Sequence, residues 1–445
     1  MAGIVAHPLH SPRMPPRDTL PPSLALSLLF ALALCAGLMI KFWLASRQIR
    51  HVARHRAQVP APFAERIPLP AHHKAADYTL AKARLGLLDM ALGAAVLVGW
   101  TLLGGLDLLN QALLAWLGGG MVQQLALLAA FALISGLIDL PLSLAQTFGV
   151  EQRFGFNQMT WKLWLSDLLK STLVGALIGL PIAALILWLM GAAGPLWWLW
   201  AWGAWMGFNV LLMWVYPSFI APLFNRFQPL QDEALKARVT ALMQRCGFAA
   251  KGLFVMDGSR RSAHANAYFT GFGAAKRVVF YDTLLQQLTP AEVEAVLAHE
   301  LGHFKHRHIA QRMAGLFALS LAGFALLGWL STQGWFYTGL GVVPNLSLDG
   351  AAPNDALALL LFLLAVPVFS FFIAPLMAQW SRRHEFQADA YAMAQADGGA
   401  LASALLKLYQ DNASTLTPDP LYVKYYYSHP PATERLARLP SPAHA

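Results

Sequence analysis

The stretch His299-Glu300-Leu301-Gly302-His303 places two histidines four residues apart, with a glutamate directly after the first. On a helix, residues spaced by four lie on one face about one turn apart, so both imidazoles can bind one zinc ion. The glutamate then lies near the open position of the metal, where it can accept a proton from a bound water. The stretch therefore predicts the core of a metal-dependent peptidase site.

The residues before this motif favour a helix. Thr289 is a good N-cap, Pro290 takes the first helical position, and Glu292 completes a capping box with the threonine. The following segment 291–301 is rich in strong helix formers and contains neither glycine nor proline. The alternative is an exposed amphipathic helix with solvated histidines, and the motif alone does not exclude it.

A third ligand is expected downstream, because catalytic zinc sites use three protein ligands and keep one position open. The segment Glu385-Phe386-Gln387-Ala388-Asp389 is the best candidate, since its two carboxylates are also four residues apart on a predicted helix. We expect Glu385 to complete a site for one zinc ion per chain, and Asp389 to accept the N–H of a ligating histidine. The alternative is a solvated acidic face. The long apolar segment directly before it and the scarcity of acidic residues in the chain argue against that alternative.

The composition is that of an integral membrane protein. Hydrophobic residues make up 57% of the chain, charged residues make up only 12%, and the mean hydropathy is +0.48. A soluble domain carries about twice that share of charge. Seven apolar stretches are long enough to cross or nearly cross a bilayer. They lie at residues 23–45, 86–106, 121–143, 168–191, 195–217, 309–331 and 355–379.

Positive charge predicts the orientation of these spans. The loop after the first span carries eight lysines and arginines, whereas the loops after the second, fourth and sixth spans carry none. The positive-inside rule then places the N-terminus outside and the C-terminus in the cytoplasm. Residues 218–308 and 380–445, which carry the candidate zinc ligands, share the cytoplasmic side. The bilayer explains the net charge of +9, and no nucleic-acid-binding motif is present.

The chain divides into three parts in this interpretation. Residues 1–21 are expected to form a flexible tail, because the segment is polar and rich in proline. Residues 22–217 form an N-terminal membrane domain with five spans, and residues 218–445 form a protease domain that includes the last two. The cysteines Cys35 and Cys246 are not expected to pair, because one lies in a predicted span and the other outside the membrane.

The segment 218–308 has the pattern of an α+β fold. Residues 232–246 have helical periodicity, and residues 253–256 read as a short strand. Residues 267–270 and 277–281 read as two strands of a hairpin, joined by a glycine-rich turn at 271–273.

Three further histidines lie near these features. His306 and His308 follow the zinc motif beside Lys305 and Arg307, and we interpret this basic cluster as an anchor at the membrane surface. His264 precedes the predicted hairpin and is a weaker candidate for a role near the substrate.

Several segments between about residue 150 and residue 435 resemble, in order, those of the type I CAAX prenyl proteases. These are seven-span membrane zinc metalloproteases, and the resemblance is greatest to their bacterial members. The matching segments are Glu151-Gln152-Arg153-Phe154-Gly155-Phe156-Asn157, Ile220-Ala221-Pro222-Leu223-Phe224-Asn225, Asn266-Ala267-Tyr268-Phe269 with Gly271-Phe272, the zinc motif, Ser381-Arg382-Arg383 with Glu385 to Asp389, and Ser428-His429-Pro430-Pro431 with Glu434-Arg435.

The resemblance implies an α-helical multi-pass membrane protein. Its seven transmembrane helices would form a barrel around a large water-filled chamber, capped by a cytoplasmic α+β zincin-like metalloprotease domain. The resemblance implies that His299, His303 and Glu385 hold zinc and that Glu300 is the general base. A bacterial member would lie in the inner membrane with its active site facing the cytoplasm.

The resemblance also implies roles for residues that periodicity does not single out. His429 and Arg435 would stabilise the oxyanion of the tetrahedral intermediate. The strand that contains Asn266, Ala267 and Tyr268 would bind the substrate backbone as an added strand, and the edge of a sheet is a common binding place for an extended peptide.

The predicted function is hydrolysis of peptide bonds in membrane-associated or lipidated, CAAX-like polypeptides, with quality control of membrane proteins as a candidate role. One rival is an intramembrane protease of the site-two type, whose third ligand is an aspartate in a Leu-Asp-Gly context. The chain contains Leu348-Asp349-Gly350, but this tripeptide falls in a loop predicted to lie across the membrane from His299. The other rival is a channel or transporter without catalysis, and the intact set of ligands and base argues against it.

Overall fold

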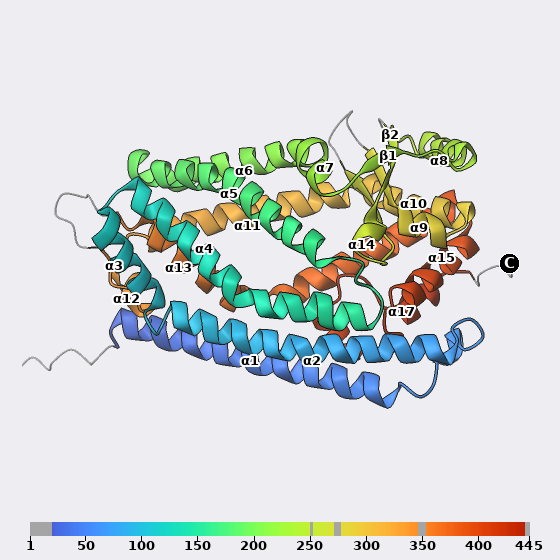
Figure 1. Cartoon of the computed structure of the whole chain (residues 1–445), viewed down its shortest axis with the longest axis horizontal. Coiled ribbons are helices and arrows are strands. Elements are labelled where there is room, and N and C mark those ends of the chain that lie inside the picture. The colour runs from blue at the N-terminus through green and yellow to red at the C-terminus, as the bar shows by residue number, and fades with distance from the viewer. Residues whose placement is uncertain (1–19, 250–251, 271–276, 346–352, 441–445) are drawn as a thin grey trace, which may run out of the picture.

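The computed structural model describes residues 20–249, 252–270, 277–345 and 353–440. Long helices run side by side over most of its length, and a small sheet lies at one end (Figure 1). Within these residues six single helices are long and apolar enough to cross a membrane. They are α1 (Pro22–Arg54), α2 (Leu69–Trp100), α4 (Met121–Leu144) continued by η2 (Ala145–Glu151), α5 (Trp161–Ala192), α6 (Trp197–Val215) continued through η4 (Tyr216–Ile220) and α7 (Ala221–Phe224), and α11 (His308–Leu330).

The seventh predicted span is a bent pair of helices. Helix α13 (Asp355–Ser370) and helix α14 (Ala374–Gln395) meet at an angle of 69°. Pro367 lies near the end of α13, where its missing N–H weakens the helix. The Tyr425 hydroxyl donates a 2.9 Å hydrogen bond to the carbonyl of Phe371 within the bend. The bend therefore separates a membrane helix from the helix that carries the predicted third zinc ligand.

Five of the six single spanning helices are longer than the apolar stretches that predicted them, and α11 has the predicted length of 23 residues. Helix α2 has 32 residues, which corresponds to about 48 Å, whereas the hydrocarbon core of a bilayer is about 30 Å thick. It begins at Leu69, well before the predicted stretch 86–106. Such helices continue beyond the bilayer, toward the end of the molecule that holds the sheet (Figure 1).

These helices form a closed ring. Each contacts the next in the order α2, α4, α5, α6, α11, α13 and α1, and α1 contacts α2. Only 6% of the most apolar window in the α4–η2 helix is buried inside the chain. Such low burial is expected when the outer face contacts lipid and the inner face does not pack against a solid core. The predicted barrel of helices is therefore present, and the water-filled chamber stays a prediction.

The sheet has the strand order β1-β2-β4-β3. Strands β2 (Gly252–Met256) and β4 (Arg277–Tyr281) are parallel, whereas β1 (Phe227–Pro229) and β3 (Ala267–Thr270) pair antiparallel with their neighbours. The predicted strands are confirmed, and β1 was not predicted because it is only three residues long. The predicted turn at 271–273 lies outside the described residues. Strand β3 pairs only with β4 among the described strands, so it forms an edge of the sheet.

A single core joins the sheet to the surrounding helices. Leucines from four helices and Phe280 of the sheet are fully buried in it. The helices are α8 (Glu233–Arg245), α9 (Asp282–Gln287), α10 (Pro290–Lys305) and α15 (Gly398–Asp411). The short helices α16 (Pro420–Tyr426) and α17 (Ala432–Leu436) complete this end of the molecule.

Residues 218–308 and 380–440 meet at this end, opposite α3 (Gly105–Leu117) and α12 (Gly334–Gly339) (Figure 1). The prediction that the two segments share one side of the membrane is consistent with this arrangement, and the cytoplasmic identity of that side stays a prediction. Cys35 and Cys246 are both free, as expected. The predicted tail falls almost entirely on residues 1–19, outside the described part.

Candidate active site

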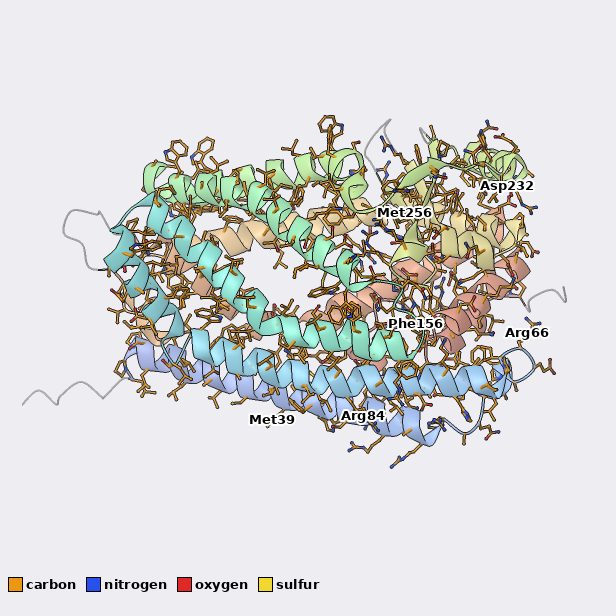
Figure 2. The ribbon with its side chains drawn as sticks, in the orientation of Figure 1. Met39, Arg66, Arg84, Phe156, Asp232 and Met256 are labelled. Atoms are coloured by element: carbon orange, nitrogen blue, oxygen red, sulfur yellow. The ribbon has the colours of Figure 1, made fainter. Side chains whose placement is uncertain are left out.

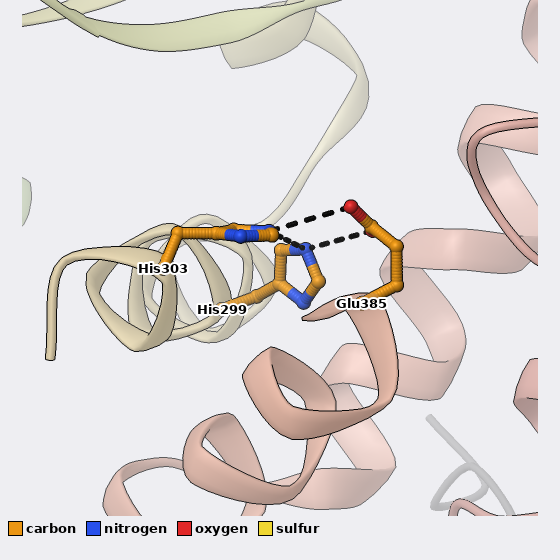
Figure 3. Close-up of side chains that lie close together, drawn as sticks. All are labelled: His299, His303 and Glu385. Carbon is orange, nitrogen blue, oxygen red and sulfur yellow. Dashed lines mark hydrogen bonds and ion pairs between the residues drawn. The ribbon is translucent and has the colours of Figure 1, made fainter. Parts of the chain in front are cut away.

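Helix α10 presents the two motif histidines on one face. The predicted capping box is present, since Glu292 N donates to the Thr289 hydroxyl at 3.4 Å and Thr289 N donates to the Glu292 carboxylate at 2.7 Å. The Nε2 atoms of His299 and His303 lie 3.3 Å apart. Both imidazoles point toward Glu385 on helix α14 (Figure 3).

Gly302 allows α14 to approach α10 closely enough for this contact. A Cβ atom at position 302 would lie 2.9 Å from the Cα atom of Ala388, a distance that real side chains do not tolerate. The close approach brings Glu385 to the histidines. Its Oε2 lies 3.5 Å from His299 Nε2, and its Oε1 lies 3.5 Å from His303 Nε2.

The three side chains have the geometry of a metal site. Donor atoms bound at about 2.0–2.1 Å to one tetrahedral zinc ion lie roughly 3.3–3.4 Å apart. One ligand atom from each of the three residues lies within 4.8 Å of the others, with 3.3 Å between the two Nε2 atoms and 3.5 Å from each Nε2 to a different oxygen of Glu385. The buried Oε2 atom of Glu385 has no hydrogen-bond partner among the described residues, and an unpaired buried oxygen is costly unless a cation compensates it. Two imidazoles and a carboxylate are a typical donor set for catalytic zinc.

His299 is oriented by a buried ion pair on the far side of its ring. Its Nδ1 lies 2.8 Å from Asp389 Oδ1, and the carboxylate accepts a 2.9 Å hydrogen bond from Arg435 Nε. Because the carboxylate only accepts, Nδ1 carries the proton and Nε2 keeps its lone pair for the metal. Asp389 thus lies where the sequence argument expected it.

Arg435, for which the resemblance implies an oxyanion role, contacts the residues behind His299, and its implied role stays a prediction. Its guanidinium is buried, bonds to both oxygens of Asp389 and approaches His299 Nδ1 at 3.4 Å. These contacts are across the imidazole ring from the metal-facing Nε2. The geometry favours a role in holding Asp389 over direct contact with substrate.

His303, the second histidine of the motif, contacts His308, a residue that we predicted from the sequence to lie at the membrane surface. His308 is fully buried, and its Nδ1 lies 3.0 Å from His303 Nδ1. Its Nε2 lies 2.8 Å from the side-chain oxygen of Gln387. The expectation of a surface anchor is wrong for His308, because Arg307 adopts a left-handed conformation with φ 55° and turns the chain back toward α10. His306 remains exposed, as expected of a surface residue.

The hydrogen bonds from His303 to His308 and from His308 to Gln387 fix the tautomers of both histidines. When Nε2 of His303 binds a metal, its Nδ1 carries the proton and donates to Nδ1 of His308. His308 then carries its own proton on Nε2 and donates to Gln387. Both rings are neutral in this arrangement, and each metal ligand is held by a different acceptor.

Glu300 is next to His299 on α10 and is partly buried. Burial raises the pKa of its carboxyl group above the ordinary value for glutamate. A general base is most effective when its pKa approaches the working pH, so this shift suits a proton acceptor.

His429 approaches the site from a different direction. Its side chain is 64% exposed, and its Nε2 lies 3.4 Å from Glu385 Oε1. The Ser428 hydroxyl lies 3.1 Å from its Nδ1, and the Tyr409 hydroxyl donates to the Pro430 carbonyl at 3.3 Å. The loop therefore places an imidazole beside the predicted metal ligands without burying it.

The implied substrate strand starts next to the same space. Asn266 accepts a hydrogen bond from Tyr281 N at 3.0 Å, which fixes the entry into β3. Residues Ala267 and Tyr268 then pair with Phe280 and Val279. Asn266 and His429 both line one cavity of about 830 Å³. The metal ligands, the exposed imidazole and the free strand edge thus lie at one end of the helical ring.

Comparison with known proteins assigns the family. Two family models match nearly the whole chain, "CAAX prenyl protease N-terminal, five membrane helices" over residues 48–226 and "Peptidase family M48" over residues 229–443. The chain belongs to peptidase family M48. It is therefore a membrane metalloprotease, and the rival site-two and transporter interpretations are not supported. Asp349 of the site-two alternative lies outside the described residues.

Named M48 relatives are similar over most of the chain. The CAAX prenyl protease 1 homolog of Arabidopsis thaliana is 38% identical over 320 residues, which cover 72% of this chain and 74% of that protein. CAAX prenyl protease 1 of Saccharomyces cerevisiae is 34% identical over 401 residues, which cover 86% and 88%. The crystal structure of S. mikatae Ste24p superposes with a TM-score of 0.86 at 31% identity, covering 94% of this chain and 99% of that one. These comparisons do not test the predicted bacterial origin, which stays a prediction.

Proposed function

We propose that this M48 metalloprotease binds one zinc ion per chain and cleaves peptide bonds of membrane-associated or lipidated, CAAX-type polypeptides. The observation that carries the proposal is the convergence of His299, His303 and Glu385, which bring one ligand atom each within 4.8 Å of one another. The substrate class rests on the names of its M48 relatives, which are CAAX prenyl proteases.

The residues around these three ligands supply the other parts of the reaction. His299, His303 and Glu385 would hold the zinc ion, which when bound would supply Lewis-acid chemistry toward the substrate carbonyl and the attacking water. Glu300 accepts the proton of the attacking water and returns it to the leaving amine. Asp389, held by Arg435, keeps His299 in the tautomer that presents Nε2 to the metal.

His429 is the proposed donor to the developing oxyanion. When the Ser428 hydroxyl donates to its Nδ1, the proton of the neutral ring is on Nε2, which faces the metal ligands. Such a donor stabilises charge that exists only in the transition state. The free edge of β3, with Asn266, Ala267 and Tyr268, is proposed to pair with the substrate backbone.

The proposed location is an integral membrane one with the active site on the cytoplasmic side. The positive charge of the loops at the protease end supports this orientation, because lysine and arginine accumulate in cytoplasmic loops. A bacterial inner membrane is the proposed setting. The partners are then a peptide or protein substrate and the surrounding lipid.

The test is a Glu300→Gln variant of the full chain in lipid nanodiscs, with a fluorogenic CAAX peptide as substrate. Glutamine keeps the size and polarity of the side chain but cannot accept the proton, so turnover should fall at least ~10²-fold. Zinc content, measured by mass spectrometry, should stay at the wild-type level.

Glu233→Gln is the matched control, because Glu233 is exposed on α8, away from the site. It should change neither zinc content nor turnover. Wild-type turnover in Glu300→Gln would refute the base assignment. A zinc-loaded wild-type protein that leaves CAAX peptides intact while cleaving other peptides would refute the substrate class.

A further inference from the structure

A cavity separate from the active site lies where the last turn of α1 meets helix α16. Its volume is about 810 Å³, which is within the range of cavities that bind small ligands. His51, Arg54 and His55 line it from α1 and the residue that follows, and Lys424 lines it from α16. Neither His429 nor any of the predicted metal ligands lines it, so it is not part of the site described above.

The lining of this cavity is mainly basic. Arg54, Arg382 and Lys424 are cations, and Glu434 is the single acidic residue among the described residues that line the cavity. Neither Arg54 nor Lys424 forms an ion pair with a carboxylate in the part of the chain that the structure describes. Unpaired cations around a concave surface raise the local concentration of anions.

The two walls are already joined by a buried carboxylate that does not offset this charge. Asp419 Oδ2 accepts a 2.9 Å hydrogen bond from Arg47 of α1, and its Oδ1 accepts hydrogen bonds from the N–H groups of Leu421 and Tyr422 at 3.0 Å. Gln48 of α1 accepts a 2.7 Å hydrogen bond from Asp419 N. The positive charge of the cavity therefore stays available to a ligand, and the positions of the walls are fixed without one.

Arg382 of α14 connects the cavity to the loop that carries His429. Its Nη1 donates to the carbonyls of Val423 and Tyr427 at 2.7 and 2.8 Å, at the C-terminal end of α16. His429 follows two residues later, and the chain returns to line the cavity at Pro431. The loop with the exposed imidazole thus begins and ends at residues that border the cavity.

The cavity lies close to the level of the lipid headgroups. The guanidinium of Arg47 lies over the ring of Trp43, 5.4 Å from its centroid, and tryptophan is enriched at membrane interfaces. Arg54 is seven residues beyond Arg47 on α1, which is about two helical turns. Figure 2 shows Met39 near the middle of α1 and Arg66, in the loop after α1, at the protease end. Lipid headgroups and soluble anions can both reach such a position.

We propose that this cavity binds a phosphate group and that the bound group restrains the loop that carries His429. Cations from α1, α14 and α16 line the cavity, and a doubly charged phosphate can accept hydrogen bonds from all three, whereas a carboxylate has one charge and two oxygens. The phosphate belongs either to an anionic lipid headgroup or to a soluble phosphate compound, because both present the same chemistry. The inference goes beyond the proposed peptidase function and does not depend on it.

The test measures phosphate binding to the full chain in phosphatidylcholine nanodiscs. One arm adds radiolabelled pyrophosphate to the solution, and the other includes phosphatidic acid in the discs and counts retained lipid by native mass spectrometry. Arg54→Gln combined with Lys424→Gln removes the two unpaired cations. Binding should weaken about 25-fold, because each basic residue near a membrane surface contributes roughly a factor of five.

Arg50→Gln combined with Lys305→Gln is the matched control. Both residues are exposed, and neither lines the cavity. This variant removes the same charge, so a diffuse attraction to the protein surface would weaken equally in both double variants. That equality, or a lack of binding by both probes, would overturn the inference. Glu434→Gln removes the one acidic residue of the lining and should strengthen binding about fivefold.

The two arms identify the source of the phosphate. Retention of phosphatidic acid without binding of pyrophosphate assigns the site to a lipid headgroup. Binding of pyrophosphate without retention of phosphatidic acid assigns it to a soluble compound. Binding of both probes with mutual displacement shows one site that accepts either source.

Hydrogen–deuterium exchange tests the restraint of the loop. With the probe at about ten times its dissociation constant, amide exchange in residues 420–436 should slow about tenfold wherever it requires opening of the occupied cavity. The Arg54→Gln and Lys424→Gln double variant should show no slowing at that concentration. Unchanged exchange in the wild-type protein with probe bound would overturn the restraint. Neither readout uses peptide cleavage, so a protein that binds phosphate as expected but cleaves no CAAX peptide would contradict only the proposed function.

Discussion

The two halves of the active site are held in different ways. The metal-binding half lies between α10 and α14, where Glu385 and Asp389 are 2% and 4% exposed. The substrate-facing half includes His429, whose side chain is 64% exposed, on a loop between short helices. Buried side chains with several partners keep one geometry, whereas an exposed imidazole with few contacts can move.

This difference suggests a division of labour. The ligand geometry is set before any substrate arrives, because helix packing and the Arg435–Asp389 pair fix it. We expect His429, the proposed oxyanion donor, to gain its final position only when a peptide covers it, because catalytic hydrogen bonds often tighten when substrate binds. Changes in the first half should therefore affect metal binding, and changes in the second should affect turnover.

The largest effect should come from removing the buried ligand. Glu385→Ala leaves two histidines, and with it most of the zinc and all measurable turnover should be lost. Zinc analysis of the purified protein measures this outcome. Glu434→Ala, an exposed glutamate close to the same region, is the control. Full zinc content in Glu385→Ala would mean that another residue is the third ligand.

A substitution in the substrate-facing half should lower turnover and leave zinc content unchanged. His429→Ala should reduce kcat by about 10²–10³-fold, the typical cost of one oxyanion donor, and should leave zinc content unchanged. Steady-state kinetics together with zinc analysis separate the two effects, and His306→Ala serves as the control. Loss of zinc from His429→Ala would remove the distinction between the two halves.

A smaller effect on zinc binding is expected for Asp389 and Arg435, which hold the predicted ligand His299 in place. Asp389→Ala should weaken zinc binding by about 10–100-fold, as losses of outer-shell partners do. Arg435→Ala should shift zinc affinity in the same direction, because it releases Asp389. Competition with a chelator measures both affinities. If Arg435→Ala lowers turnover while zinc affinity stays constant, Arg435 acts on the substrate as the sequence analysis implied.

The smallest effect should be at the partner of the second histidine. His308→Ala should weaken zinc binding by about 10-fold, the low end for such partners, since a neutral imidazole is a weaker acceptor than the carboxylate behind His299. The exposed neighbour His306→Ala is again the matched control. A loss larger than that of Asp389→Ala would show that the neutral partner contributes more to zinc binding than the charged one, and would contradict this order.

Local patterns predicted the parts of the site that are close in sequence. The capping box at Thr289 and the spacing of four fixed the helix and the face of its histidines, because both depend only on backbone geometry. The pair Glu385 and Asp389 followed from the same spacing. The apolar stretches likewise located the six single spanning helices, because bilayer thickness sets their length, whereas the stretch 355–379 falls across the bend between α13 and α14.

Local sequence patterns could not predict the contacts between segments that are distant in the sequence. The approach of Arg435 to Asp389 joins residues 46 positions apart and depends on the path of α15 to α17. The burial of His308 depends on a left-handed residue, Arg307, that is not a glycine, and such residues are uncommon in that conformation. The three-residue strand β1 carries too little pattern to be recognised.

Because of the bend between α13 and α14, a small rotation at the start of α14 produces a larger displacement further along this helix. Glu385 is eleven residues beyond the start of α14, so at 1.5 Å per residue it lies about 16 Å from the pivot. A rotation of 1° at the pivot would move this carboxylate by about 0.3 Å, more than the ~0.2 Å that a metal–ligand distance tolerates. If tilting of α13 in the bilayer were transmitted freely to α14, the displacement of Glu385 would therefore weaken metal binding. The hydrogen bond from Tyr425 to Phe371 and the close packing of α14 against α10 at Gly302 oppose this rotation. They therefore keep the geometry of the metal site independent of changes in membrane thickness.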